Sequence, residues 1–117
     1  GARVSEKLDV KAMRMASTAF LGEHDFTSFM STGADTVSAV RNVKDVHVVR
    51  SGGLVRIFVT ANGFLYNMVR LIAGVLVRAG QGKIDKAGVE KLIALKNKHA
   101  VREVMPAEGL YLVSVKY

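Results

Sequence analysis

The sequence of 117 residues contains no cysteine and a single proline. The absence of cysteine excludes disulfide bridges, thiolate metal ligands and a thiol nucleophile, and it is compatible with a cytoplasmic location. No apolar run reaches the roughly 20 residues that a membrane-spanning helix needs. The three histidines, at positions 24, 47 and 99, are too scattered to suggest a metal site. We therefore expect no metal, no membrane partner and a cytoplasmic protein.

Several motifs of catalysis are also missing. The chain has neither a phosphate-binding loop of the G-x-x-x-x-G-K-[ST] type nor a G-x-S-x-G nucleophile elbow. Glu23 and Asp25 lie so close together in the chain that we interpret them as part of a solvated polar turn and not as an acid–base pair. From its residues alone, the chain shows no complete set of catalytic groups.

The charge of the chain is strongly one-sided. The sequence contains seventeen Lys and Arg residues and ten Asp and Glu residues, which gives a net charge of +7. The excess is concentrated in Phe64–Arg102, which carries eight basic and two acidic side chains. Such a distribution is typical of proteins that bind a polyanion, above all a nucleic acid. A basic surface that only keeps the protein soluble is the alternative.

The length and the 50% hydrophobic content predict one domain, residues 1–117, with a modest core. The stretch Asn62–Lys83 has the strongest pattern and is predicted to form one helix. Asn62 is the expected N-cap, and Gly80 and Gly82 mark the end. The predicted apolar stripe comprises Phe64, Leu65, Met68, Val69, Ile72, Val75, Leu76 and Ala79. The opposite side carries Tyr66, Asn67, Arg70, Gly74 and Arg78.

Arg70 is the most informative residue of this helix. It lies one helical turn from Tyr66 and one turn from Gly74. A glycine inside a helix costs about 1 kcal/mol relative to alanine, so Gly74 is expected to clear space for a chain segment or a ligand. A plain solvated arginine on an outer helix face is the alternative.

The rest of the chain predicts an α+β fold, with helices packed on one face of a small, mostly antiparallel sheet. A first helix is expected from Asp9, its N-cap, to about Leu21, and another at Lys86–Asn97 with Asp85 as N-cap. Strands are expected at 41–50, 54–61 and 110–117, with a tight turn at 51–53. Residues 23–25 are predicted to be a polar turn, 30–39 a loop and 99–107 a connector.

Three ordered motifs resemble the TruA-type tRNA pseudouridine synthases. The helix sequence Phe64-Leu-Tyr-Asn-Met-Val-Arg70, followed by Ile72-Ala-Gly74, resembles that family's helix signature. Gly22–Phe29 and Glu108–Leu112 resemble two further segments of its C-terminal half. The resemblance extends from about Leu8 to Tyr117 and implies one half of an enzyme built from two related α+β halves, with an active site in the cleft between them.

The resemblance also implies a division of chemical roles. The family isomerises uridine to pseudouridine in tRNA, here expected in the anticodon stem-loop, without a cofactor or a metal. Its nucleophile is an Asp in an Arg-Thr-Asp motif of the N-terminal half, which is absent from this sequence. Arg70 matches the arginine that pairs with that Asp. The chain alone is therefore expected to be inactive.

The remaining site residues are also expectations from the resemblance. Tyr66 and Asn67 match substrate-binding positions at which family members often carry His, and Leu110 and Leu112 match an apolar wall beside the base. Arg78 and Lys83 are candidates for contacts with the RNA backbone. The expected partners are tRNA, the N-terminal half and a second copy of the protein, because family members form homodimers. A non-catalytic RNA-binding or dimerisation module on the same half-fold is the alternative function.

Overall fold

The computed structural model describes residues 7–31 and 37–107. Its elements, in chain order, are α1 (Val10–Ser17), the 3-10 turn η1 (Thr18–Phe20), β1 (Gly22–Asp25), the 3-10 turn η2 (Thr27–Phe29), β2 (Val40–Ser51), β3 (Leu54–Ala61), α2 (Met68–Gly80), α3 (Lys86–Leu95) and α4 (Lys98–Val104). The described strands form an antiparallel sheet in the order β1-β2-β3. The predicted α+β class, with helices on a small antiparallel sheet, is confirmed.

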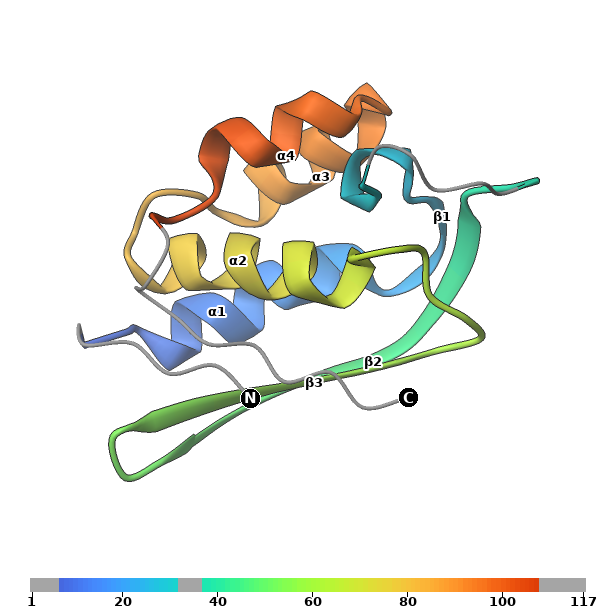
Figure 1. Cartoon of the computed structure of the whole chain (residues 1–117). Helices are drawn as coiled ribbons and strands as arrows, with labels where there is room; N and C mark the ends of the chain where they lie inside the picture. Colours follow the sequence, from blue (N-terminus) through green and yellow to red (C-terminus); the bar gives the residue numbers. More distant parts are fainter. Residues whose placement is uncertain (1–6, 32–36, 108–117) are drawn as a thin grey trace.

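The helices are stacked above the sheet in two layers (Figure 1). α1 and α2 lie side by side directly above the β2–β3 hairpin, and α3 and α4 lie above them. α2 is therefore enclosed between the sheet, α1 and α4. This position explains why eleven of its thirteen residues are buried.

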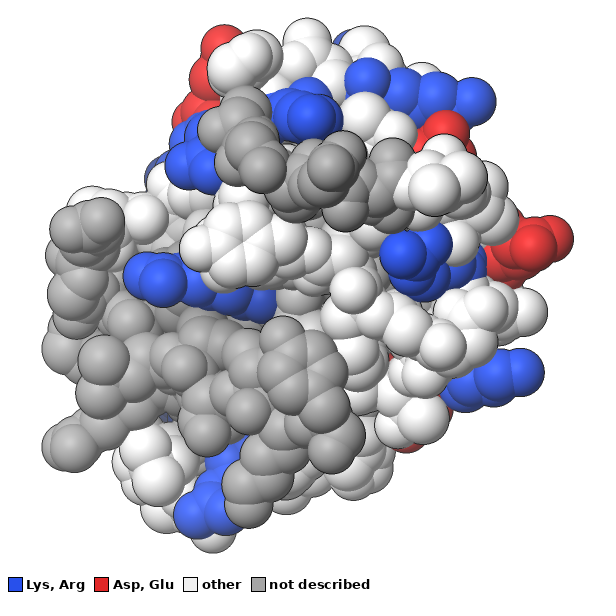
Figure 2. Space-filling view, turned by 45° about the vertical axis from the view of Figure 1, so that its right-hand side comes forward, with Lys and Arg blue, Asp and Glu red and all other residues white. Residues whose placement is uncertain are grey.

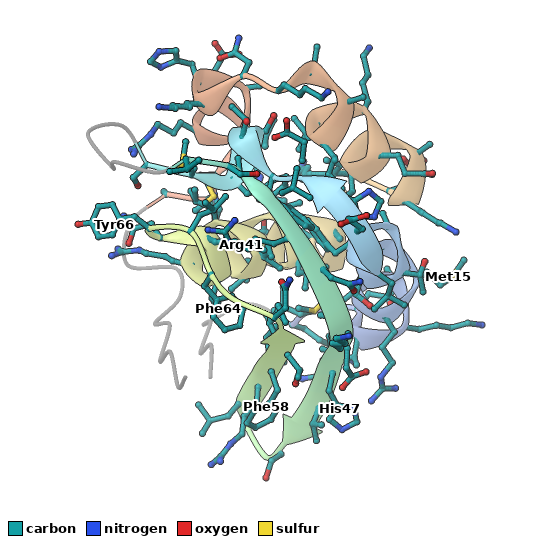
Figure 3. All side chains as sticks on the ribbon, turned by 90° about the vertical axis from the view of Figure 1, so that its right-hand side faces the viewer. Met15, Arg41, His47, Phe58, Phe64 and Tyr66 are labelled. Carbon is teal, nitrogen blue, oxygen red and sulfur yellow. The ribbon has the colours of Figure 1, made fainter. Side chains whose placement is uncertain are left out.

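The β2–β3 hairpin matches its prediction closely. Ser51 pairs with Leu54, so Gly52 and Gly53 form a two-residue turn, and Gly52 has the positive φ of 61° that such turns require. Val48, Val55 and Ile57 are buried against the helices. The opposite face is uncovered by described residues, and it carries Phe58, which is 47% exposed and packs beside His47 (Figure 3).

α1 is held at both its start and its middle. Asp9 caps it as predicted, because its Oδ1 accepts a hydrogen bond from the Ala12 N–H at 3.0 Å. Arg14 Nε donates to the Val48 carbonyl at 3.0 Å, and Arg50 Nη2 donates to the Leu8 carbonyl. Both arginines thus tie α1 to β2 through backbone acceptors.

The predicted start of the central helix is wrong. α2 begins at Met68, and Asn62 instead closes the hairpin: its Oδ1 accepts from the Asn42 N–H at 2.8 Å, while its own N–H donates to the Asn42 carbonyl at 3.1 Å. The predicted end is confirmed. Gly82 has a φ of 75°, and the Lys83 N–H donates to the Arg78 carbonyl, as in a Schellman motif.

Two further expectations are corrected. Residues 23–25 belong to strand β1 and not to a polar turn, because they pair with Val40–Asn42 of β2. Part of the expected 99–107 connector is helix α4, whose N-cap Asn97 accepts a hydrogen bond from the His99 N–H. α3 and its N-cap Asp85 agree with the prediction, although the helix ends at Leu95 and not at Asn97. The predicted strand at 110–117 lies outside the described residues.

Three phenylalanines connect β1 and η2 to the core. Phe20, Phe26 and Phe29 are fully buried, and Phe29 meets the other two rings edge to face. They fix the position of the segment that leads to Ser31. Among the described residues, no helix has the length and apolar character needed to span a membrane.

Candidate functional site at the start of α2

The turn before α2 presents Tyr66 to solvent. Leu65 and Met68 on either side are buried, and the Met68 N–H donates to the Leu65 carbonyl at 3.0 Å. Tyr66 itself is 64% exposed and points away from the body of the molecule (Figure 3). The two buried neighbours thus anchor a short turn whose aromatic side chain is available to a ligand.

Asn67 turns the backbone into the helix. It adopts the left-handed conformation, with φ 62° and ψ 9°, which Asn tolerates better than most residues. Its carbonyl accepts the Leu71 N–H at 3.0 Å, and its side-chain Nδ2 donates to Ser31 Oγ at 2.8 Å. The side chain does not cap the helix. Asn67 instead fixes the helix start against the Ser31 segment.

Ser31 is buried, with only 3% of its surface exposed, and its hydrogen bonds join three segments of the chain. Its N–H donates to the Tyr66 carbonyl at 3.1 Å, and its Oγ accepts from Asn67 and, at 3.2 Å, from Arg102 Nη2 of α4. We call Ser31, Asn67 and Arg102 the Ser31 junction. It is the contact that places the Tyr66–Asn67 turn.

Arg70 lies one turn beyond Asn67 and is exposed. Its neighbours Val69 and Leu71 are buried. Arg70 makes no hydrogen bond or ion pair with any residue in the described ranges. Arg70 and the half-buried Arg78 are the two residues of α2 that are not buried. Gly74, one turn further, is buried.

The candidate RNA-backbone residues lie at the far end of α2. Arg78 is half-buried, and its Nη1 donates to Gln81 Oε1 at 2.9 Å, whereas its buried Nε has no hydrogen-bond partner within the described part of the chain. Lys83 is exposed and lines an open groove of 690 Å³ between α1 and the start of α3. The groove includes neither Tyr66 nor Arg70. Leu110 and Leu112 lie outside the described residues.

Asp25, dismissed above as a catalytic acid, has a structural role. The Thr27 hydroxyl donates to its Oδ1 at 2.6 Å, and the Thr27 N–H donates to the same atom at 3.0 Å. The hydroxyl hydrogen bond is the largest of the effects that lower the pKa of Asp25 below its ordinary value of 3.8. The described residues contain no cluster of three or more His, Asp or Glu side chains that could hold a metal ion.

Sequence reasoning missed Arg102 and Arg41. Arg102 belongs to a helix that was predicted to be a connector, although Asn97 directly before it is a typical N-cap residue. Arg41 is half-buried beside Gly63, at the base of the turn (Figure 3), and its Nη1 donates to the Ser38 and Val40 carbonyls. No sequence pattern marks Arg41, because its position depends on strand pairing.

Comparison of the sequence with known proteins identifies the family of the chain. The family model described as tRNA pseudouridine synthase matches residues 16–117. The "tRNA pseudouridine synthase A" of Acetivibrio thermocellus is 42% identical over 114 residues, which cover 97% of this chain and 47% of that protein. The relative of the same name from Prochlorococcus marinus is 43% identical over 115 residues, or 98% of this chain and 40% of that protein.

The fold is an α+β domain in which α2 carries one exposed guanidinium, that of Arg70. The chain belongs to the tRNA pseudouridine synthase family. It spans about half the length of the curated relatives that it matches most strongly.

Proposed function

We propose that this chain is the C-terminal half of a TruA-type tRNA pseudouridine synthase. Its role is to supply Arg70 to the active site that forms with the N-terminal half, together with part of the surface that binds tRNA. The observation that carries the proposal is Arg70: a guanidinium that is exposed on a mostly buried helix, without a carboxylate partner among the described residues, four residues after the exposed Tyr66.

The chemistry gives Arg70 a defined task. In the isomerisation, the N-glycosidic bond of uridine breaks, the uracil turns, and a C–C glycosidic bond forms, so that no atom is gained or lost overall. The nucleophilic Asp comes from the N-terminal half. A guanidinium beside that carboxylate favours its ionised form, and two parallel hydrogen bonds fix its orientation.

Tyr66 and Asn67 are proposed to contribute to the substrate pocket in different ways. The exposed Tyr66 ring offers a surface on which a base can stack, and a base must leave its helical stack before chemistry can occur on it. Asn67 is engaged by Ser31, so its part is to hold the turn. Leu110 and Leu112 are proposed to form the apolar wall beside the base.

The wider assignments rest on the family. We propose tRNA, with its anticodon stem-loop, as the substrate, a homodimer as the assembly and the cytoplasm as the location. Lys83 is exposed and free to approach a phosphate, whereas one N–H of Arg78 is already occupied by Gln81. Lys83 is thus the better candidate for a contact with the RNA backbone.

The test is to restore the missing half. This chain is joined to the N-terminal half of the Acetivibrio thermocellus relative, and pseudouridine is measured by chromatography of nucleosides from digested tRNA. The hybrid should be active and this chain alone inactive. Loss of one preorganised electrostatic contact in an active site lowers kcat by about 10²–10³, so Arg70→Ala should have an effect of this size.

The control is Arg56→Ala, which removes an exposed arginine from the uncovered face of β3 and should leave activity unchanged. Activity of this chain alone would show that the nucleophile has been placed in the wrong half. An active hybrid that tolerates Arg70→Ala would remove Arg70 from the mechanism. A folded hybrid that binds tRNA without converting it would favour the non-catalytic RNA-binding module.

A further inference from the structure

Arg102 is a second exposed arginine at the site, and neither the sequence patterns nor the proposed reaction uses it. It lies in α4, and Nη2 of its guanidinium donates to Ser31 Oγ at 3.2 Å. Ser31 is separated from it by 71 residues along the chain and is almost completely buried. An exposed, flexible side chain is thus fixed at one point by a buried acceptor.

This contact uses only part of the guanidinium. An arginine side chain carries five N–H donors, and the bond to Ser31 is the only hydrogen bond that the Arg102 guanidinium makes with a described residue. No carboxylate of the described ranges forms an ion pair with it. The Ser31 oxygen has two lone pairs, and Asn67 and Arg102 occupy both. Arg102 is therefore oriented but not neutralised.

The Ser31 junction also places Arg102 close to the proposed active site. Asn67 and Arg102 bond to the same oxygen atom, and Arg70 follows Asn67 by one turn. Residues four apart lie on the same side of a helix, so Lys98 extends the cationic line along α4. In Figure 2, Lys and Arg side chains, interspersed with Asp and Glu, lie along the upper edge of the molecule, where α3 and α4 run.

We propose that Arg102 binds a phosphate of the RNA backbone next to the base that Arg70 and Tyr66 approach. This inference rests on the proposed function, because it requires an RNA substrate. A guanidinium whose orientation is already set loses less entropy when it binds, and its planar fork suits two phosphate oxygens. The Ser31 junction then links the phosphate contact to the turn that carries Tyr66 and to the start of α2.

The test is the salt dependence of RNA binding by the full chain. A synthetic tRNA anticodon stem-loop is titrated at a series of KCl concentrations, and log Kd is plotted against log[KCl]. Each phosphate contact contributes about 0.7–0.9 to this slope. Arg102→Gln should therefore lower the slope by about that amount, whereas Arg102→Lys, which keeps the charge, should retain it.

Arg56→Gln is the matched control, because it removes the same charge from an exposed arginine of β3 on the other side of the sheet; its slope should equal that of the unchanged chain. If Arg102 only tethers α4 to Ser31, Arg102→Gln will lower the free energy of unfolding and leave the slope unchanged. That result would overturn the inference. So would a chain that binds no stem-loop RNA, and the activity of the hybrid enzyme would then still decide the proposed function independently.

Discussion

Nδ2 of Asn67 donates a hydrogen bond to Ser31 Oγ at 2.8 Å, across 36 residues of chain. The bond holds a residue whose backbone is left-handed, directly before the first residue of α2. It combines a local backbone requirement with a long-range contact. The two contributions can be separated by mutation.

Asn67→Gly keeps the left-handed backbone and removes only the side-chain hydrogen bond. We expect it to lower the free energy of unfolding by about 0.5–1.5 kcal/mol. Asn67→Ala removes the same bond and adds the cost of a left-handed non-glycine residue, about 1–2 kcal/mol. Urea denaturation of both variants measures the difference. Equal stabilities would mean that the backbone at position 67 relaxes when the bond to Ser31 is lost.

Gly80 is required by packing and not by its backbone angles. A Cβ at this position would lie 2.9 Å from Met13 Sδ and 3.1 Å from Leu8 Cβ. We expect Gly80→Ala to destabilise the protein by about 1–3 kcal/mol through overpacking, although alanine favours helices by about 1 kcal/mol over glycine. Thermal unfolding measures this change. Gly53→Ala is the control, because a Cβ there has no neighbour within 4 Å, and it should stay within about 0.5 kcal/mol.

Asp25 gives the protein a pH-dependent contribution to stability. Its pKa is lowered, chiefly by the Thr27 hydroxyl, so the contribution is complete well above pH 3.8 and is lost as the pH falls through the lowered pKa. Thr27→Val should raise the pKa of Asp25 toward 3.8, as measured by NMR titration. The stability gap between the two proteins should shrink in acid. Lys96→Gln, which removes the smallest of the four effects, should shift the pKa less.

Asn62 closes the base of the β2–β3 hairpin, and its variants should report on the sheet. Asn62→Ala leaves the Asn42 N–H without its side-chain acceptor, and because this hydrogen bond is exposed we expect a cost of about 0.5–1.5 kcal/mol. Asn62→Asp keeps an acceptor oxygen and should cost less. Hydrogen exchange at the Asn42 amide is the direct measurement. Unchanged protection in Asn62→Ala would show that the hydrogen bond to Asn62 is not what protects this amide.

The elements that could be predicted from the sequence are those fixed by local interactions. Asp9 and Asp85 bond to amides three residues ahead, so both helix starts follow from nearby residues. Gly52 and Gly82 supply the positive φ angles that end a strand and a helix. The predicted start of α2 was wrong because it depends on a long-range contact. Asn62 is a favourable N-cap residue type, but it forms hydrogen bonds with Asn42 of β2 and does not cap a helix.

The residues of the candidate site also differ in whether local sequence or long-range contacts define their positions. Arg70 and Tyr66 were proposed as site residues from one contiguous motif, and both are exposed; their role stays a prediction. Arg102 could not be found from the sequence, because its bond to Ser31 joins residues 71 positions apart. Strand β1 was missed because Glu23 and His24 are polar and because a short edge strand is defined by its partner and not by its own pattern.

The Ser31 junction also affects the order in which the protein becomes functional. The hairpin closes over two glycines and can form early, whereas contacts between distant residues must overcome a larger loss of chain entropy. During synthesis, α4 follows all the other described elements, so Ser31 lacks one of its partners until Arg102 has left the ribosome. A nascent chain therefore acquires the mature geometry of the Tyr66–Asn67 turn only when the last described helix has folded against it.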